Sequence, residues 1–133
     1  MRDPNNPCLF CNIKESGFTH QNTLAYVSYD SYPVTNHHCL IIPKRHVSNY
    51  FTLTNEEIIA CNDLIKLVRQ EILNKDKTVE AFNIGVNTGK IAGQSIMHCH
   101  IHLIPRRKGD VENPQGGVRS VIPSKQHYIR KNK

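Results

Sequence analysis

The chain has 133 residues and a mass of 15.2 kDa, which suits one domain with a hydrophobic core and is too little for two. Apolar residues make up 38% and charged residues 21%, and this ordinary globular usage excludes a disordered or collagen-like chain. No apolar run approaches the roughly 20 residues that cross a bilayer, and residues 1–12 lack the apolar core of a secretory signal. We therefore expect a cytoplasmic protein with no membrane anchor.

The net charge of +6 lies in the C-terminal tail. Residues 1–105 carry 9 Lys and Arg and 9 Asp and Glu, whereas residues 106–133 carry 8 and 2. A basic tail attracts phosphates or nucleic acid, but a solvated terminus has the same composition. The five Cys are an odd count in a cytosol-like chain and indicate metal binding or free thiols rather than a disulfide framework.

Four short segments predict strands. The first 23 residues are polar and predict an arm with little regular structure. Residues 24–30 and 38–42 are short apolar segments that predict strands. Residues 80–87 and 97–104 alternate apolar and polar side chains, and they predict two more strands that a glycine-bearing loop joins as a hairpin.

One long helix is predicted over residues 54–74. Thr54 and Glu57 have the spacing of a capping box at its start. The apolar side chains that follow are three and four residues apart and predict one face packed on the core: Ile58, Cys61, Ile65, Val68 and Ile72. The whole pattern predicts an α+β fold, an antiparallel β-sheet with one main α-helix packed on it, as a single domain over residues 1–133.

Three alternating His mark the last predicted strand. In the sequence His-Cys-His-Ile-His-Leu-Ile, the side chains of His98, His100 and His102 share one face, and the residues between them face the core. The Cα atoms of adjacent His would lie roughly 6.6 Å apart, and imidazoles at this spacing can contact one ligand or relay through hydrogen bonds. Two chemistries fit: a catalytic zinc on the three His with an open fourth position, or attack by a neutral imidazole on phosphorus, with a covalent intermediate that water cleaves.

The glycine-bearing loop before this strand favours the second chemistry. Asn87, Gln94 and Ser95 can donate hydrogen bonds to phosphate oxygens, and Gly93 lets backbone N–H groups come close. A nucleophilic mechanism therefore uses more of the sequence than a three-His zinc does.

These residues resemble the signature of the histidine triad family, His-φ-His-φ-His-φ-φ, where φ is apolar. Further segments that resemble this family, in the same order along the chain, are 30–33, 38–46, 83–87 and 93–95. The resemblance extends from Cys8 to Pro105, most of the chain. One departure is His37, which stands where the family often has a Gly that serves a turn.

The resemblance implies a homodimeric hydrolase that cleaves at the α-phosphate of a purine nucleotide derivative, a dinucleoside polyphosphate or a nucleotide phosphoramidate. His100 would attack and form a nucleotidyl-histidine intermediate, and His102 and His38 would support its tautomer and the phosphate. The residues implied to bind substrate are Asp30 for the ribose, Asn87, Gln94 and Ser95 for phosphate oxygens or the leaving group, Phe10 and Ile13 for the base, and Arg119 for a distal phosphate. Because the uridylyltransferase branch lacks the third His, His102 favours hydrolysis over transfer.

Cys8 and Cys11 form a Cys-x2-Cys pair, which is half of a zinc site, although two buried thiols have the same spacing. A subset of histidine triad proteins is similar, and there the zinc also takes the His of Pro-Lys-x-His and the first His of the triad. On this resemblance we expect a structural Zn2+ on Cys8, Cys11, His46 and His98 that tethers the N-terminal arm, residues 1–23, to the sheet. Two His of the triad would then remain for chemistry.

Two other functions stay open. The same pocket can serve a nucleotide-binding sensor with little turnover, whose basic tail recruits nucleic acid. A zinc hydrolase of another reaction class is the second alternative.

Overall fold

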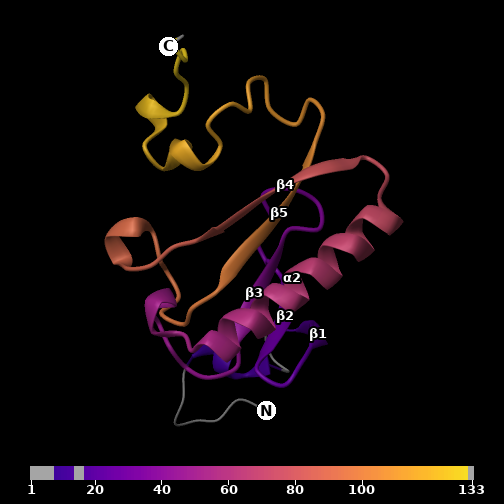
Figure 1. Cartoon of the computed structure of the whole chain (residues 1–133), viewed down its shortest axis with the longest axis vertical. Coiled ribbons are helices and arrows are strands. Elements are labelled where there is room, and N and C mark those ends of the chain that lie inside the picture. The colour runs from indigo at the N-terminus through magenta and orange to yellow at the C-terminus, as the bar shows by residue number, and fades with distance from the viewer. Residues whose placement is uncertain (1–7, 14–16, 132–133) are drawn as a thin grey trace.

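The computed structural model describes residues 8–13 and 17–131. One antiparallel sheet has the strand order β1-β2-β3-β5-β4. The strands are β1 (Phe18–Gln21), β2 (Ala25–Tyr29), β3 (Cys39–Pro43), β4 (Val79–Val86) and β5 (Ile101–Arg107). The helices are α2 (Asn55–Lys75) and the short 3-10 helices η1 (Leu9–Cys11), η2 (Tyr50–Thr52), η3 (Lys90–Ala92), η4 (Val118–Val121) and η5 (Pro123–Lys125). The helix α2 crosses one face of the sheet, which confirms the predicted α+β fold (Figure 1).

The helix α2 begins at the predicted capping box. The hydroxyl of Thr54 accepts from the N–H of Glu57 at 3.1 Å, and the Glu57 carboxylate accepts from the N–H of Thr54 at 2.8 Å. Three of the five predicted core residues, Cys61, Val68 and Ile72, are buried, and Ile65 packs against the core, but Leu64 is also buried and Ile58 is 37% exposed. The predicted stripe, which includes Ile58, and the observed one, which includes Leu64, both have helical spacing. Periodicity alone therefore cannot tell which of these overlapping faces is buried.

The main core lies between α2 and the sheet. Its strand residues alternate along three neighbouring strands: Ala25, Val27, Cys39, Ile41, Ile101 and Leu103. Burying an aliphatic side chain of this size contributes roughly 1.5–3 kcal/mol. Because side chains alternate along a strand, the residues between these point to the other face, where the histidines gather.

The strand β5 begins at Ile101, so the predicted start at residue 97 was wrong. Residues 98–100 have no strand pairing, and the N–H of Cys99 donates to the carbonyl of Val47 at 2.7 Å. The strand also continues beyond the predicted end, because Pro105 pairs with Phe82 on β4. The alternation itself holds, since Cys99 is fully buried on the core side.

The arm has more regular structure than predicted. The strand β1 pairs with β2 at the sheet edge, and η1 lies between the two Cys of the Cys-x2-Cys pair. Edge strands carry polar side chains on both faces, so β1 has no apolar signal in the sequence. Residues 1–7 and 14–16 of the arm lie outside the described residues.

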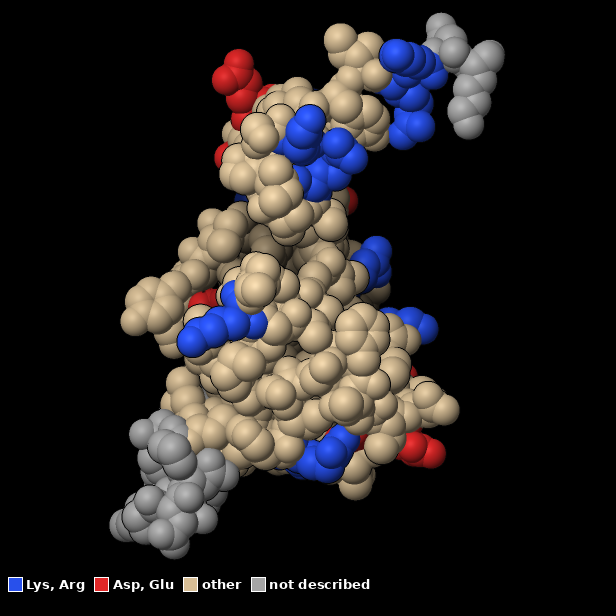
Figure 2. Space-filling model, turned by 90° about the vertical axis from the view of Figure 1, so that its left-hand side faces the viewer, with Lys and Arg blue, Asp and Glu red and all other residues tan. Residues whose placement is uncertain are grey.

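The C-terminal segment, residues 108–131, lies at the opposite end of the molecule from β1 (Figure 1). Almost all of its side chains are exposed. Figure 2 shows Lys and Arg gathered on this segment and a hollow where it overhangs the body. Within the described residues, no helix has both the length and the apolar character needed to cross a membrane.

Candidate active site

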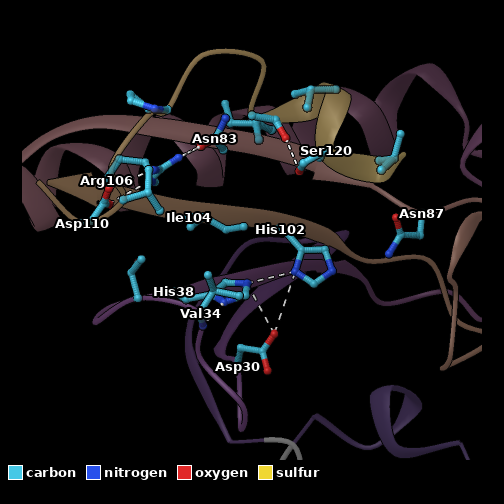
Figure 3. Close-up of a pocket in the computed structure, with 18 of the residues that line it drawn as sticks. Asp30, Val34, His38, Asn83, Asn87, His102, Ile104, Arg106, Asp110 and Ser120 are labelled. Atoms are coloured by element: carbon cyan, nitrogen blue, oxygen red, sulfur yellow. Dashed lines mark hydrogen bonds and ion pairs between the residues drawn. The ribbon is translucent and has the colours of Figure 1, made fainter. Parts of the chain in front are cut away.

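A cavity of about 770 Å³ lies on the face of the sheet opposite α2, between the turn after β2 and the C-terminal segment. This volume is within the range of about 300–1,000 Å³ that small-molecule sites occupy. The polar and charged side chains in its wall include Asp30, His38, Asn83, Asn87, His102, Arg106, Asp110, Ser120 and Gln126 (Figure 3). The cavity therefore joins residues of the predicted site to groups of the C-terminal segment.

His100 is buried just before β5 and lies outside the cavity wall, next to His102, which is part of the wall. Its ring centroid is 5.3 Å from that of His102. Its Nδ1 lies 2.8 Å from the carbonyl oxygen of His98, and because a carbonyl can only accept, Nδ1 carries the hydrogen. In the neutral ring Nε2 then has a free lone pair, which is the form that attacks an electrophile.

His38 and His102 are joined by a short hydrogen bond, with Nε2 of His38 at 2.9 Å from Nδ1 of His102. A carboxylate oxygen of Asp30 lies 3.4 Å from the same Nε2 and 3.9 Å from the same Nδ1 (Figure 3). Burial lowers the pKa of His38, with Asp30 opposing the effect. Burial also lowers the pKa of His102, and His100 and His38 lower it further while Asp30 opposes. Both rings are therefore held in their neutral forms at neutral pH.

The loop between β4 and β5 separates the three predicted phosphate ligands. Asn87 faces the cavity and Ser95 is exposed, whereas Gln94 is buried. The Gln94 amide donates to the carbonyls of Ser48 and Ile96 at 2.9 and 3.1 Å. Its oxygen accepts from a backbone N–H of the same loop at 2.9 Å. Gln94 therefore shapes the loop, and Asn87 and Ser95 are placed to meet a ligand.

Phe10 and Ile13, the predicted base contacts, belong to a second apolar cluster on this face of the sheet. The Phe10 ring meets the His100 ring edge to face at 5.1 Å between centroids. The hydroxyl of Tyr26, a residue that the sequence did not single out, donates to the carbonyl of Phe10 at 2.6 Å. This buried bond holds η1 against the sheet beside His100.

Cys8, Cys11, His46 and His98 come together as predicted. Sγ of Cys8 lies 3.4 Å from Nδ1 of His98, and Sγ of Cys11 lies 3.1 Å from Nδ1 of His46 and 3.5 Å from Nδ1 of His98. All four atoms lie within 4.8 Å of one another. Ligands at about 2.3 Å for sulfur and 2.0 Å for nitrogen on a tetrahedral zinc are roughly 3.5 Å apart, so this donor set fits the metal.

His98 is prepared for a metal by its other nitrogen. Nε2 of His98 donates to the carbonyl of Pro43 at 2.7 Å, so in the neutral ring the lone pair is on Nδ1, which faces the thiols. Burial lowers the pKa of this ring, which keeps it neutral. A metal at this site would take one nitrogen of the first triad His and leave the other two His to the cavity.

The alternative of a catalytic zinc on all three triad His does not fit the geometry. His98 uses Nδ1 toward the thiols and Nε2 toward Pro43, and His100 uses Nδ1 for a carbonyl. In the described part of the chain, the groups with metal-ligand spacing are the Cys–His set and the set Asp30, His38 and His102. The three triad imidazoles do not converge on one point.

Arg119 lies within the C-terminal segment and outside the cavity wall. Its Nε donates to the carbonyls of Lys125 and Gln126 at 3.1 and 3.3 Å, and its guanidinium lies 4.7 Å from the ring centroid of Tyr128. The Arg in the cavity wall is Arg106, which the sequence did not single out. The one signal that could have identified Arg106 is its position four residues after His102 on β5, because strand alternation places both side chains on the same face.

Comparisons with known proteins agree with this geometry. The HIT domain family matches residues 13–109. The adenosine 5'-monophosphoramidase of Schizosaccharomyces pombe is 31% identical over 103 residues, 74% of each chain. The asymmetrical bis(5'-nucleosyl)-tetraphosphatase of the same yeast is 40% identical over 80 residues, which are 59% of this chain and 42% of that one. The crystal structure of a Zn-bound histidine triad family protein from Mycobacterium smegmatis has a TM-score of 0.72 and 26% identity over 80% of each chain.

The family match covers most of the chain, including all three alternating His, and places the protein in the histidine triad class. The chain belongs to the HIT domain family. The predicted family and the predicted enzyme class, a histidine triad hydrolase, are thereby confirmed.

Proposed function

We propose that the protein hydrolyses a purine nucleotide derivative at its α-phosphate through a nucleotidyl-histidine intermediate on His100. The observation that carries this proposal is the bond from Nδ1 of His100 to the carbonyl of His98 at 2.8 Å, which leaves Nε2 with the lone pair. Nε2 attacks phosphorus, the bond from phosphorus to the leaving group breaks, and water then cleaves the phosphorus–nitrogen bond. Attack and release on one side chain divide a difficult hydrolysis into two easier steps.

The neighbouring residues support these steps. His102, beside the nucleophile, can donate from Nε2 to a phosphate oxygen or to the leaving group. Asn87 supplies a further donor in the cavity wall, and Ser95, exposed on the same loop, would supply another, since fixed dipoles stabilise charge that develops in the transition state. Asp30, in the cavity wall, would accept from the ribose hydroxyls, and the cluster around Phe10 and Ile13, outside that wall, would contact the base.

The cavity wall favours a leaving group with little negative charge. Arg106 is the one Lys or Arg among the described residues of the wall. Its Nε and Nη2 both donate to the Asp110 carboxylate at 2.8 Å, and Nη1 donates to the Asn83 oxygen at 2.7 Å. The positive charge of Arg106 is therefore already neutralised by Asp110 and offers little attraction to a polyphosphate leaving group. Between the two expected substrates we therefore propose a nucleotide phosphoramidate, whose leaving group is an amine.

We propose a structural Zn2+ on Cys8, Cys11, His46 and His98. Four protein ligands complete a tetrahedral site, and a closed site of this kind stabilises the fold without taking part in bond cleavage. The ion would hold η1, and with it Phe10, against the sheet.

We also propose a homodimer that forms through the outer edge of β4. This strand ends the sheet and, within the described residues, pairs only with β5. Ile84 at its centre pairs with Leu103 on β5 and is 53% exposed. An unpaired strand edge with an exposed apolar side chain is a natural site for a second copy.

Brief mixing followed by intact-protein mass spectrometry tests the proposal. Wild type mixed with adenosine 5'-phosphoramidate should carry a transient adenylyl adduct, which His100→Gly should lack. His127→Gly, at an exposed His outside the cavity wall, is the matched control and should keep the adduct. Binding of adenylates without adduct or AMP in wild type would contradict the proposal and would favour the nucleotide sensor.

A further inference from the structure

A backbone group determines which nitrogen of His38 carries the hydrogen. The N–H of Val34 donates to Nδ1 of His38 at 3.0 Å. Since a backbone amide can only donate, Nδ1 must hold the lone pair, and the neutral ring must carry its hydrogen on Nε2. This assignment follows from the type of partner alone.

The assignment passes from His38 to His102. The Nε2–H of His38 can only donate across the 2.9 Å contact, so Nδ1 of His102 accepts and Nε2 of His102 carries the hydrogen. This second nitrogen points away from His38 and toward the Asn87 end of the cavity (Figure 3). His102 is thereby held as a hydrogen-bond donor on the side where the proposed substrate lies.

The turn that presents the Val34 N–H is held by main-chain and side-chain bonds. The Thr35 hydroxyl donates to the carbonyl of Pro105 on β5 at 2.6 Å, and the Thr35 carbonyl accepts from the N–H of His38 at 3.1 Å. Arg107 donates to the carbonyl of Asn36 at 3.1 Å. The Val34 side chain takes no part in this arrangement and is 71% exposed.

We propose that the turn of residues 34–37 sets the tautomers of both His38 and His102, with Val34 and Thr35 as positioning residues. Without the Val34 donor, Nδ1 of His38 is free to carry the hydrogen, and Nε2 then becomes an acceptor. His102 would turn its hydrogen toward His38 and would lose its donor toward the cavity. The kinetic consequence rests on the proposed function, whereas the tautomers themselves do not.

The same turn explains why the set Asp30, His38 and His102 is a hydrogen-bond relay and not a metal site, although its donor atoms have metal-ligand spacing. A neutral His that binds a metal through Nε2 carries its hydrogen on Nδ1. In His38 that hydrogen would point at the Val34 N–H, and two donors would oppose each other.

Replacing the peptide bond that carries this N–H by an ester tests the proposal, because the α-hydroxy analogue of valine in place of Val34 removes only the donor. Two-bond nitrogen–proton NMR correlations of the imidazole rings should show Nε2–H for both His38 and His102 in the unmodified protein. In the ester variant His38 should become a mixture of tautomers. The value of kcat should fall in proportion to the fraction of molecules that lose the Nε2–H form of His38, about twofold for an equal mixture.

Two further variants separate the tautomer from general damage to the fold. Val34→Ala keeps the N–H and should keep both tautomers. Thr35→Val removes the tether to Pro105 and should shift the His38 tautomer partway, whereas Thr35→Ser keeps the hydroxyl and should restore it. An Nδ1–H form of His38 in the unmodified protein, or an ester variant with unchanged tautomers, overturns the proposal.

The NMR measurement of the tautomers needs no substrate. Absence of turnover in a protein with the expected tautomers therefore overturns the proposed function and supports the tautomer assignment. A shifted tautomer with an unchanged rate in the ester variant overturns the catalytic role of the turn.

Discussion

The backbone carbonyl of His98 accepts the Nδ1–H of His100 at 2.8 Å, and the imidazole of the same His98 faces the thiols of Cys8 and Cys11. One residue therefore connects the candidate metal site to the candidate nucleophile. A change at the metal ligands displaces His98, and the orientation of the His100 ring depends on it.

Loss of one thiolate ligand should release the metal. Cys11→Ala is expected to lower the zinc content, measured by elemental analysis, from about one ion per chain to a small fraction of that. A loss of about 3 kcal/mol in the free energy of unfolding would lower Tm by roughly 10 °C. The rate should fall less than in His100→Gly, since the nucleophile remains. Cys39→Ala, at a buried thiol outside the cluster, should keep its zinc. Full zinc content in Cys11→Ala would refute the site.

Acid should destabilise the fold through His38 and His102. Burial lowers the pKa of both rings below 6.5, the value for an unfolded chain. Above pH 6.5 both states are neutral and the full stability is present. As the pH falls from 6.5 toward the folded-state pKa values, the unfolded chain binds protons first and stability is lost, by about 1.4 kcal/mol per pH unit for each such His at most.

Urea unfolding between pH 8 and pH 5 measures this effect. The free energy of unfolding should be nearly constant above pH 7 and should fall below pH 6.5. The variant with both His38→Gln and His102→Gln should have a shallower slope. If the free energy of unfolding of the double variant falls with pH as steeply as that of the wild type, the acid sensitivity comes from other groups.

Local sequence patterns were sufficient for the parts of the fold that depend on side-chain type. The capping box at Thr54 and the Cys-x2-Cys pair are read from spacing, and the structure has both arrangements. The start of β5 was missed because the apolar alternation begins at residue 97, in a segment that has no strand pairing.

The groups that prepare the site chemically could not be predicted. The partners of His38, His98 and His100 are a backbone N–H and two carbonyls, which any residue type can supply. The Arg106–Asp110 pair, which compensates the charge of the cavity wall, depends on the turn after β5 bringing the two together. Such contacts are properties of the folded chain and leave no signature in spacing.

His37, which stands where the family often has Gly, should lower the stability of the fold by a measurable amount. It has φ +74°, the left-handed region in which glycine is favoured. His37→Gly and His37→Ala both lose the imidazole, so their comparison isolates the backbone. We expect the glycine variant to be more stable by about 0.5–1 kcal/mol, the left-handed penalty less the entropy of glycine in the unfolded chain. Equal values of Tm would show that the turn relaxes around an alanine.

Gly116 holds the C-terminal segment over the cavity. A Cβ at Gly116 would lie 2.0 Å from the carbonyl oxygen of Gln126, and its φ is +72°. Gly116→Ala should displace the segment and raise KM for a phosphoramidate with a large aromatic amine by roughly tenfold, equivalent to about 1.4 kcal/mol of lost contact. The unsubstituted phosphoramidate should react as before, because its ammonia leaving group does not reach the segment.

Gly109 offers a matched control for this variant. It has φ +81° but no atom within 4 Å of an added Cβ, so Gly109→Ala has the backbone strain without the clash. Hydrogen exchange of residues 114–126 should rise in Gly116→Ala and stay unchanged in Gly109→Ala. If Gly116→Ala shows faster hydrogen exchange but the same selectivity between the two phosphoramidates, the C-terminal segment takes no part in substrate recognition.

The proposed dimer should depend on Ile84. A carboxylate in its place would lie at an apolar interface beside its symmetry mate, and burying it unpaired costs several kcal/mol. Light scattering should therefore give about twice 15.2 kDa for wild type and about 15.2 kDa for Ile84→Asp. Ile129→Asp, at a residue that is 93% exposed on the C-terminal segment, is the control and should remain dimeric. A wild-type mass of one chain would contradict the proposed dimer. The edge of β4 would then meet solvent, and the exposure of Ile84 would need another explanation.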